Sequence, residues 1–465
     1  MSDMRVLQRV LHPSGVMLLT FSALSPVLSF YIGGDAILHM AGTGAALAFL
    51  AGGVASAILS LLYAEIGAAF PRAGGVYPSL AGLLGPIISF PYVVINLPLT
   101  FASVAFVALG LGDYVRVLLP GVPVLAIAGG AIVLAALIAM LNIRFGAVVT
   151  SAFLAIEAIA LVIVTVMAAL HPVRSISEVM AHPVMLAHGA LVATPVSVLA
   201  LAAVSGLWAT AGASWALYFA EELHEAQRRI GRVIAWTGAL AALTIAAPMV
   251  LMVLAADDLK AVLGADAPVA MYVRRAGGPV LAGVVSAGVV AAIFNSLVAN
   301  VMANGRLFYS TGRDGMWTGP VNRLLGGLHP RTGAPAVATL VVIAFALGAM
   351  FLGERALIIF LSGNVADYVL VSLAIFVGRR TGKTGHFYRA PLHPLVPVFG
   401  LGITAAAVVA DWLDPDAGRP STIVLTTLFL AALAYFHFRL RQASAVWLIA
   451  PHAQGDEAAS AAPQI

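Results

Sequence analysis

The chain has 465 residues, 61% of them hydrophobic and only 9% charged, with 24 Lys and Arg against 20 Asp and Glu. Soluble globular domains carry roughly 25% charged residues, so this chain has too little polar surface to face water on all sides. Composition therefore excludes an ordinary soluble protein, and the lack of cysteine in the sequence excludes disulfides, thiolate metal sites and cysteine nucleophiles.

Twelve apolar stretches follow one another along the chain, each about as long as the roughly 20 residues that a bilayer-crossing helix needs. Membrane β-barrels alternate polar and apolar residues, and these stretches do not. The sequence therefore predicts an all-α polytopic membrane protein with twelve transmembrane helices. We expect them at residues 15–34, 44–63, 89–112, 122–141, 147–170, 191–220, 233–256, 279–302, 334–352, 356–377, 395–410 and 421–438.

The distribution of basic residues predicts the orientation in the inner (plasma) membrane, because Lys and Arg concentrate on the cytoplasmic side. With the N-terminus inside, 17 of the 24 basic residues fall in cytoplasmic segments and 7 fall outside. Both termini are therefore expected in the cytoplasm, residues 1–14 as a tail and residues 441–465 as a disordered tail. The apolar start resembles a signal peptide, but Pro26 and the lack of a clear cleavage site favour a retained helix.

Two of the predicted helices, the first and the sixth, carry an interruption. Residues 22–29 (SALSPVLS) contain Pro26, which removes a backbone donor and clashes with the carbonyl of Ser22. Residues 205–214 (SGLWATAGAS) interrupt a stretch that is too long for one simple crossing. The breaks lie five helices apart, and because five is odd, two five-helix repeats of opposite orientation are expected. The predicted units are residues 15–170, residues 191–377 and, as an addition carrying helices 11 and 12, residues 393–440.

A broken helix has a specific chemistry inside a membrane. Backbone groups freed from the helix cannot stay unsatisfied in hydrocarbon, so they must line a polar cavity. The N-terminal end of a half-helix suits a substrate carboxylate, and the C-terminal end suits an ammonium or a cation. An α-amino acid carries both groups. Ordinary kinks and close packing remain the alternative explanation of these prolines and glycines.

Three motifs resemble the amino acid–polyamine–organocation permease family. They are YAE at 63–65 with FPRAGGVY at 70–77, AEE at 220–222 continuing to Arg232, and GRLFYSTGRDG at 305–315. Ala226 and Gly231 stand where the family commonly has prolines. The resemblance covers roughly residues 15–440. It implies a twelve-helix, five-plus-five inverted-repeat fold and secondary active transport.

The resemblance also implies where substrate binds, between helices 1 and 6 with lining from helices 3, 8 and 10. The family usually breaks helix 1 at glycines, and the serines and proline of this chain leave the substrate class open. In helix 8, Asn295, Ser296, Asn300 and Asn304 lie roughly on one face, which either lines the pathway or bonds to a neighbouring helix. The pathway is favoured for Asn295 and packing for Asn304. The residues carried over are Ser25, Pro26, Val27, Leu28, Ser29, Trp208, Thr210, Ala211, Gly212 and Ser214.

Ionisable residues inside the membrane are functional candidates. Glu157 lies midway along the fifth helix, near a point where several members of the family have a lysine that replaces a coupling cation. An apolar setting favours the protonated carboxyl, so Glu157 is expected to carry a coupling proton or to join a cation site, with structural pairing as the alternative. Asp367 in the tenth helix is the second ion-coupling candidate, with a substrate contact, a gate or helix packing as its possible roles. Glu65 is expected to pair with Arg72 or another loop arginine.

These features favour a secondary transporter over other classes of protein. The chain has no GxxxxGK[ST] phosphate-binding loop for a primary pump, and its Asp, Glu and His are too sparse in the helices for an enzyme site. No cofactor, metal or nucleic acid is expected, and a non-transporting nutrient sensor stays open. Helices 1, 3, 6 and 8 as predicted hold no acidic residue, which disfavours a polyamine, and the broken segments hold no Lys or Arg for a dicarboxylate. The expected activity is import of a neutral amino acid, with proton coupling left open; an amine or organic-acid permease or exchanger is the alternative.

Overall fold

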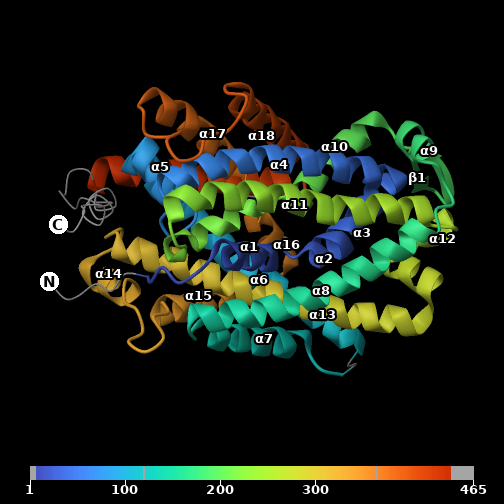
Figure 1. Cartoon of the computed structure of the whole chain (residues 1–465), viewed down its shortest axis with the longest axis horizontal. Coiled ribbons are helices and arrows are strands. Elements are labelled where there is room, and N and C mark those ends of the chain that lie inside the picture. The colour runs from blue at the N-terminus through green and yellow to red at the C-terminus, as the bar shows by residue number, and fades with distance from the viewer. Residues whose placement is uncertain (1–6, 119–120, 362–364, 441–465) are drawn as a thin grey trace, which may run out of the picture.

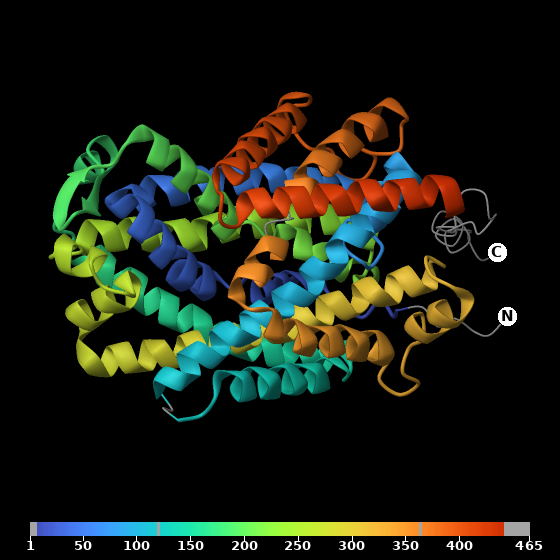
Figure 2. The ribbon, with the colours of Figure 1, turned by 180° about the vertical axis from the view of Figure 1, so that it is seen from behind.

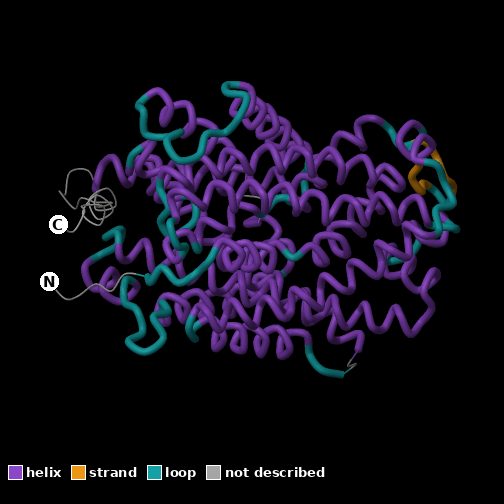
Figure 3. Tube along the Cα trace, in the orientation of Figure 1, coloured by secondary structure: helices purple, strands orange, loops and turns teal. Residues whose placement is uncertain are grey.

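The computed structural model describes residues 7–118, 121–361 and 365–440, and over these residues the chain is helical apart from one short hairpin and the connecting loops (Figure 3). The tail expected to be disordered at 441–465 lies outside the described residues. The α-helices are α1 Pro13–Leu24, α2 Pro26–Leu28, α3 Gly34–Ala41, α4 Ala45–Ala69, α5 Tyr77–Leu84, α6 Pro86–Leu118, α7 Val124–Ala139, α8 Ile143–Leu170, α9 Ile176–Ala181, α10 Val196–Thr210, α11 Ala226–Ala255, α12 Leu259–Leu263, α13 Pro268–Arg313, α14 Gly319–Leu325, α15 Ala336–Ala349, α16 Glu354–Leu361, α17 Val365–Arg380, α18 Leu395–Leu413 and α19 Gly418–Tyr435. The shorter elements are the π-helices η1 Ser29–Gly33 and η7 Phe436–Leu440, the 3-10 helices η2 Gly42–Gly44, η3 Ala213–Tyr218, η4 Ala220–Glu222 and η5 Met350–Leu352, and the strands β1 Val184–Ala187 and β2 Ala190–Ala193.

Eight helical stretches of the described chain are long and apolar enough to cross a bilayer, and two shorter apolar helices accompany them. Large apolar side chains cover the outside of these helices; on α8, for example, Val148 is 67% exposed and Ile159 61% exposed. Such a surface is stable against lipid and not against water. The chain is therefore a multi-pass membrane protein, while the number of twelve crossings and the inverted repeat stay predictions.

The long helices share one general direction and give the molecule two distinct ends (Figure 1). The hairpin of β1 and β2 lies with α9 and α12 at one end, which we call the hairpin end. Both ends of the described chain lie with α5 and α14 at the other, the termini end (Figures 1 and 2). Between them α11 packs along α4, and α13 packs against α6, α7 and α8. Helices α18 and α19 lie on the outside of α4 and α6.

The predicted sixth helix differs from the structure at its start. Residues 184–187 pair antiparallel with residues 190–193 across a turn in which His188 and Gly189 have positive φ. The prediction that the helix begins at residue 191 is therefore wrong. The apolar run 191–220 is too long for one crossing because its first residues form a strand, and the helix itself begins at Val196 after Pro195. Apolar composition alone does not distinguish these two states of the backbone.

Helices α4 and α10 cross at two glycines. A Cβ atom on Gly52 would lie 2.2 Å from the backbone nitrogen of Leu207, and one on Gly206 would lie 2.2 Å from the carbonyl oxygen of Ala48. Small residues let membrane helices approach this closely and so gain packing contacts. The crossing fixes the position of the last turn of α10, where the second predicted break follows.

Candidate functional site

The first helix is interrupted at Ser25, as the sequence predicts. Helix α1 ends at Leu24, and Ser25 adopts φ 46° and ψ 90°, which takes the chain out of the helical path. Pro26 then starts α2 at a position where its missing N–H leaves no helical hydrogen bond unmade. The interruption exposes the first N–H groups of the following segment and the last carbonyls of α1.

The carboxylate of Glu157 occupies this break from α8. Its Oε1 atom accepts hydrogen bonds from Ser25 Oγ at 2.8 Å and from the backbone N–H of Val27 at 3.0 Å. The side chain is buried, with 1% of its surface exposed, and Oε2 has no hydrogen-bond partner among the described residues. A negative group is favourable at the N-terminus of a helical segment. Glu157 therefore already binds the backbone N–H of Val27, a donor that the sequence predicts as part of a site for a substrate carboxylate.

Helix α13 contributes two side chains to the same region. Ser296 donates from Oγ to the carbonyl oxygen of Ala23, in the last turn of α1, at 3.1 Å. Asn295 lies buried beside Glu157, and neither its amide nitrogen nor its amide oxygen has a hydrogen-bond partner in the described chain. Buried polar atoms without partners are costly. Glu157 Oε2 and the Asn295 amide thus leave unused hydrogen-bonding capacity next to the break.

The second predicted break lies against the first. Helix α10 ends at Thr210, and Gly212 has φ 149° and ψ 0° before η3 begins at Ala213. A Cβ on Gly212 would lie 2.7 Å from Leu24 Cδ1, so this glycine allows the two breaks to touch. Ser56 of α4 donates to the carbonyl oxygen of Thr210 at 3.0 Å, which satisfies one group freed by the break.

The predicted substrate residues differ in accessibility. The buried ones are Ser25, Pro26, Val27, Thr210 and Asn295, and the half-buried ones are Leu28, Ser29, Trp208, Ala211, Gly212 and Ser214. The ring of Trp208 lies 5.5 Å from that of Tyr368, centroid to centroid, which links α10 to α17. Phe101 of α6 stacks on Phe345 of α15, with ring centroids 4.7 Å apart.

Asp367 on α17 has different surroundings from Glu157. It lies beside Tyr92 of α6 and interacts electrostatically with Tyr63, Tyr218 and Tyr368. Among the described residues, no Lys or Arg pairs with Asp367 or with Glu157. The core therefore holds two carboxylates without a cationic partner in that part of the chain, each in its own set of neighbours.

A cavity of about 800 Å³ lies between η1, α3, α6 and α13 at the hairpin end. It reaches Leu28 and Ser29, directly after the break in helix 1. The carboxylates of Asp35, Asp113 and Asp266 lie on its wall. Asp35 and Asp113 lie one residue past the predicted ends of the first and third helices, whereas α3 includes Asp35 and α6 continues to Leu118. Asp266 lies between two predicted helices. The prediction that helices 1 and 3 carry no acidic residue is therefore wrong.

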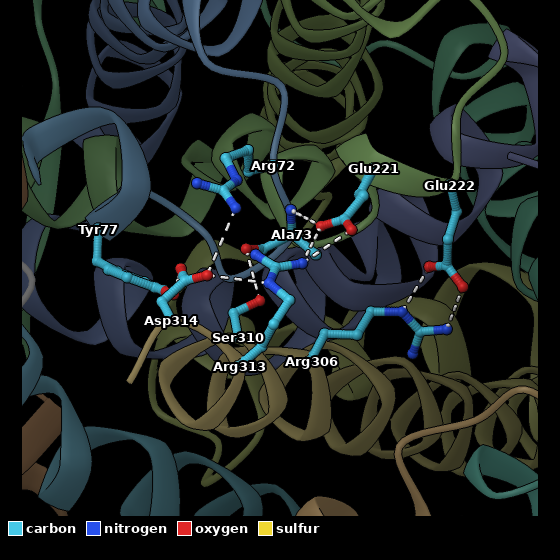
Figure 4. A network of polar contacts seen from close by, with 9 residues as sticks. All are labelled: Arg72, Ala73, Tyr77, Glu221, Glu222, Arg306, Ser310, Arg313 and Asp314. Carbon is cyan, nitrogen blue, oxygen red and sulfur yellow. Dashed lines mark hydrogen bonds and ion pairs between the residues drawn. The ribbon is translucent and has the colours of Figure 1, made fainter. Parts of the chain in front are cut away.

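At the termini end, the three motifs that carry the family resemblance meet in one polar network (Figure 4). Asp314 accepts hydrogen bonds from Tyr77 Oη at 2.5 Å and Arg313 Nε at 2.9 Å, and it forms an ion pair with Arg72 at 3.5 Å. Arg313 reaches Glu221 at 2.6 Å as well. The network thus joins residues 70–77, 220–222 and 305–315 across the end of the bundle.

Two further ion pairs are buried beside this network. Glu222 and Arg306 are joined by two hydrogen bonds of 2.6 and 3.0 Å (Figure 4). Glu65 pairs with Arg379 at 2.5 Å, which confirms an arginine partner for this residue and identifies it as Arg379. Arg72, the other partner considered, pairs with Asp314 instead. Ion pairs therefore link the helices at the termini end, while a cavity lies at the hairpin end.

Comparison with known proteins agrees with this architecture. The chain is 26% identical over 444 residues to a branched-chain amino acid permease (BcaP) of Lactococcus lactis subsp. cremoris, covering 89% of this chain and 90% of the relative. It is 25% identical over 429 residues to a methylthioribose transporter of Bacillus subtilis, covering 86% and 88%. Residues 14–438 match the family described as amino acid permease, which confirms the resemblance. The chain belongs to this amino acid permease family, whose members are transporters and not enzymes.

Proposed function

We propose that this protein is a secondary active transporter that imports a neutral amino acid by alternating access, coupled to proton movement through Glu157. The observation that carries the proposal is the position of Glu157, whose carboxylate holds the break in helix 1 through Ser25 Oγ and the Val27 N–H. In the proposed arrangement the bundle is a twelve-helix, five-plus-five inverted repeat in the plasma membrane with both termini in the cytoplasm.

Proton binding at Glu157 would act directly on the broken helix. Hydrogen bonds to a charged carboxylate are roughly twice as strong as those to a neutral acceptor. A proton on the unpartnered Oε2 removes the charge, so it weakens the hold of α8 on Ser25 and Val27. The segments on either side of the break can then move relative to α8. In this way a proton gradient would drive the change from a conformation open to one side of the membrane to a conformation open to the other side.

The substrate class is supported by the chemistry around the two breaks. Their accessible residues are hydroxyls, apolar groups and Trp208, and they include no Lys or Arg. The Asn295 amide and the carboxylate of Asp367 offer acceptors for an ammonium group. The similarity to a branched-chain amino acid permease supports an apolar side chain, and so we take leucine as the first substrate to test.

A second candidate is an amine or another solute without a carboxylate. The occupied Val27 N–H favours it, because one donor that a substrate carboxylate would use is already bound to Glu157. The similarity to a methylthioribose transporter also shows that a related chain carries a different class of solute. Organic acids, exchange of one solute for another, and sensing without transport are the remaining alternatives that the experiment distinguishes.

The experiment is uptake of radiolabelled leucine into proteoliposomes, with and without an inward pH gradient. We expect the gradient to raise uptake by the wild type, and Glu157→Gln to abolish that stimulation. Asp367→Asn serves as the matched control, since it neutralises the other core carboxylate and should change leucine affinity instead of the pH response. If Glu157→Gln left both uptake and its pH dependence unchanged, proton coupling through Glu157 would be wrong. Leucine binding without flux under any gradient would indicate a sensor.

A further inference from the structure

We infer that the cavity at the hairpin end is a charge filter, which draws in solutes that carry an ammonium group and disfavours anionic solutes. The inference rests on the proposed transport function and defines the substrate class more closely. It assigns a selective role to Asp35, Asp113 and Asp266, which lie outside the residues that the helix breaks nominate.

The charge on the cavity wall has one sign. Its three carboxylates come from three separate parts of the chain, namely α3, α6 and the segment before α13, and none of the lining residues is Lys, Arg or His. Arg116 lies 3.4 Å from Asp113, but both side chains are more than half exposed, so solvent screens this pair strongly. Asp266 forms no ion pair with a described residue. The exposed carboxylates of Asp113 and Asp266 therefore give the wall a net negative field.

A second observation lies directly behind this wall, in a side chain that neighbours two of the lining residues. Tyr31, on η1, is 3% exposed, and its hydroxyl has no hydrogen-bond partner in the described chain. Its electrostatic neighbours are Asp35 and Tyr114, and both of these line the cavity. A buried hydroxyl without a partner is costly, so a polar group bound beside Asp35 and Tyr114 would be stabilised by a hydrogen bond to Tyr31.

The rest of the wall shapes how the carboxylates act. Apolar side chains fill much of the lining, among them Phe106, Val290 and Ile293. Low-dielectric walls focus the field of charges at a cleft and raise the local concentration of ions of opposite sign. No three acidic or histidine side chains of the described chain lie close enough to hold a metal ion. A dispersed negative wall of this kind suits a monovalent ammonium group that passes on toward Leu28 and the helix break.

The inference is tested with Asp113→Asn/Asp266→Asn, both of which change exposed side chains. Asp35 is left intact, because its Oδ1 accepts the Val269 N–H at 2.7 Å and so supports the start of α13. Glu178→Gln is the matched control, since Glu178 is an exposed acid on α9 at the same end and does not line the cavity. The probes are leucine, isopentylamine, which is leucine without its carboxylate, and 4-methylpentanoate, which is leucine without its amino group.

In the wild type, isopentylamine should inhibit leucine uptake at lower concentration than 4-methylpentanoate. The double variant should weaken inhibition by the amine by roughly threefold to tenfold at low salt, and should strengthen inhibition by the acid. The difference from wild type should shrink at about 1 M salt, where charges are screened within roughly 3 Å. Glu178→Gln should behave as wild type.

Equal inhibition profiles in the double variant and the wild type would overturn the charge filter. A wild type that does not transport leucine would instead overturn the proposed function. In that case isothermal titration calorimetry measures the binding of isopentylamine to the purified full chain. This binding tests the charge filter independently of transport. Weaker binding to the double variant than to Glu178→Gln supports it, and equal binding overturns it.

Discussion

The ion pair between Arg306 and Glu222 is the most completely buried pair of charges in the described chain, with side chains 2% and 3% exposed. Arg306 also donates to the carbonyl oxygen of Met302 and lies over the ring of Phe219. Moving a charge out of water is costly, and here each charge is compensated mainly by the other. The removal of one partner alone is therefore the informative substitution.

We expect Arg306→Met to destabilise the protein by about 3–5 kcal/mol, because it leaves the Glu222 carboxylate buried without a counter-charge. Arg306→Met/Glu222→Gln should recover a large part of that loss, since no buried charge remains. Melting temperatures of the purified protein in detergent measure both effects. The control is Arg229→Ala, whose partner Glu225 lies in an exposed pair, and it should cost less than about 1 kcal/mol. A single Arg306 variant as mild as this control would contradict the prediction.

At the level of single residues, the sequence identifies which charges are unusual but not what they contact. Glu157 and Glu65 stand out because carboxylates are rare within apolar runs. Their partners, Ser25 and Arg379, are 132 and 314 residues away along the chain, so no local pattern predicts these contacts. Asp35 and Asp113 lie outside the predicted helices for a different reason. A hydropathy criterion ends a predicted helix at its first charged residue, whereas the helix in the structure continues past that residue.

The crossing of α4 and α10 gives a prediction about an element. Gly52→Ala places a methyl group 2.2 Å from backbone atoms of α10, which cannot move aside as a side chain can. We expect α10 and the break at Gly212 to shift, with a loss of roughly 1–3 kcal/mol from overpacking and a loss of leucine uptake. Melting temperature and uptake together measure the effect.

Gly130→Ala on α7 is the matched control for this substitution. Nothing lies within 4 Å of a Cβ built on Gly130, so the methyl group enters open space. An alanine in a helix interior is favoured over glycine by about 0.5–1 kcal/mol, and so this variant should be neutral or slightly more stable. If Gly52→Ala melted at the same temperature as Gly130→Ala, the close crossing would not be as tight as described.

Helices that follow from apolar composition are predicted well. Element boundaries that depend on turns and kinks of the backbone are predicted poorly. Long apolar runs indicate helices because lipid requires every backbone group to be bonded within its own segment. The same reasoning fails at residues 191–193, which are apolar but pair as a strand in the hairpin. It also ends the eighth helix too early: the segment that begins after the break at Gly278, as predicted, continues as a helix to Arg313 and not only to residue 302.

On the scale of the whole molecule, the two ends differ in a way that suits alternating access. The termini end is cross-linked by the network around Asp314 and by the pair of Glu222 with Arg306 (Figure 4). The hairpin end holds the acidic cavity, which leads to the break in helix 1. If the termini are cytoplasmic, as the basic residues predict, this conformation is open toward the outside. The orientation of the molecule therefore decides which side the cavity serves.

The orientation can be tested by thiol labelling, because the chain has no cysteine of its own and each introduced cysteine is the single thiol present. We expect Glu178→Cys on α9 and Ser286→Cys on the cavity wall to react with a membrane-impermeant maleimide in intact spheroplasts. Arg323→Cys on α14, at the termini end, should react only after permeabilisation. Gel-shift labelling measures all three, and the wild type controls for reaction at other groups. Labelling of Arg323→Cys in intact cells, with Glu178→Cys protected, would show that the protein has the opposite orientation in the membrane. The cavity would then face the cytoplasm, and the acidic filter would act on solutes leaving the cell.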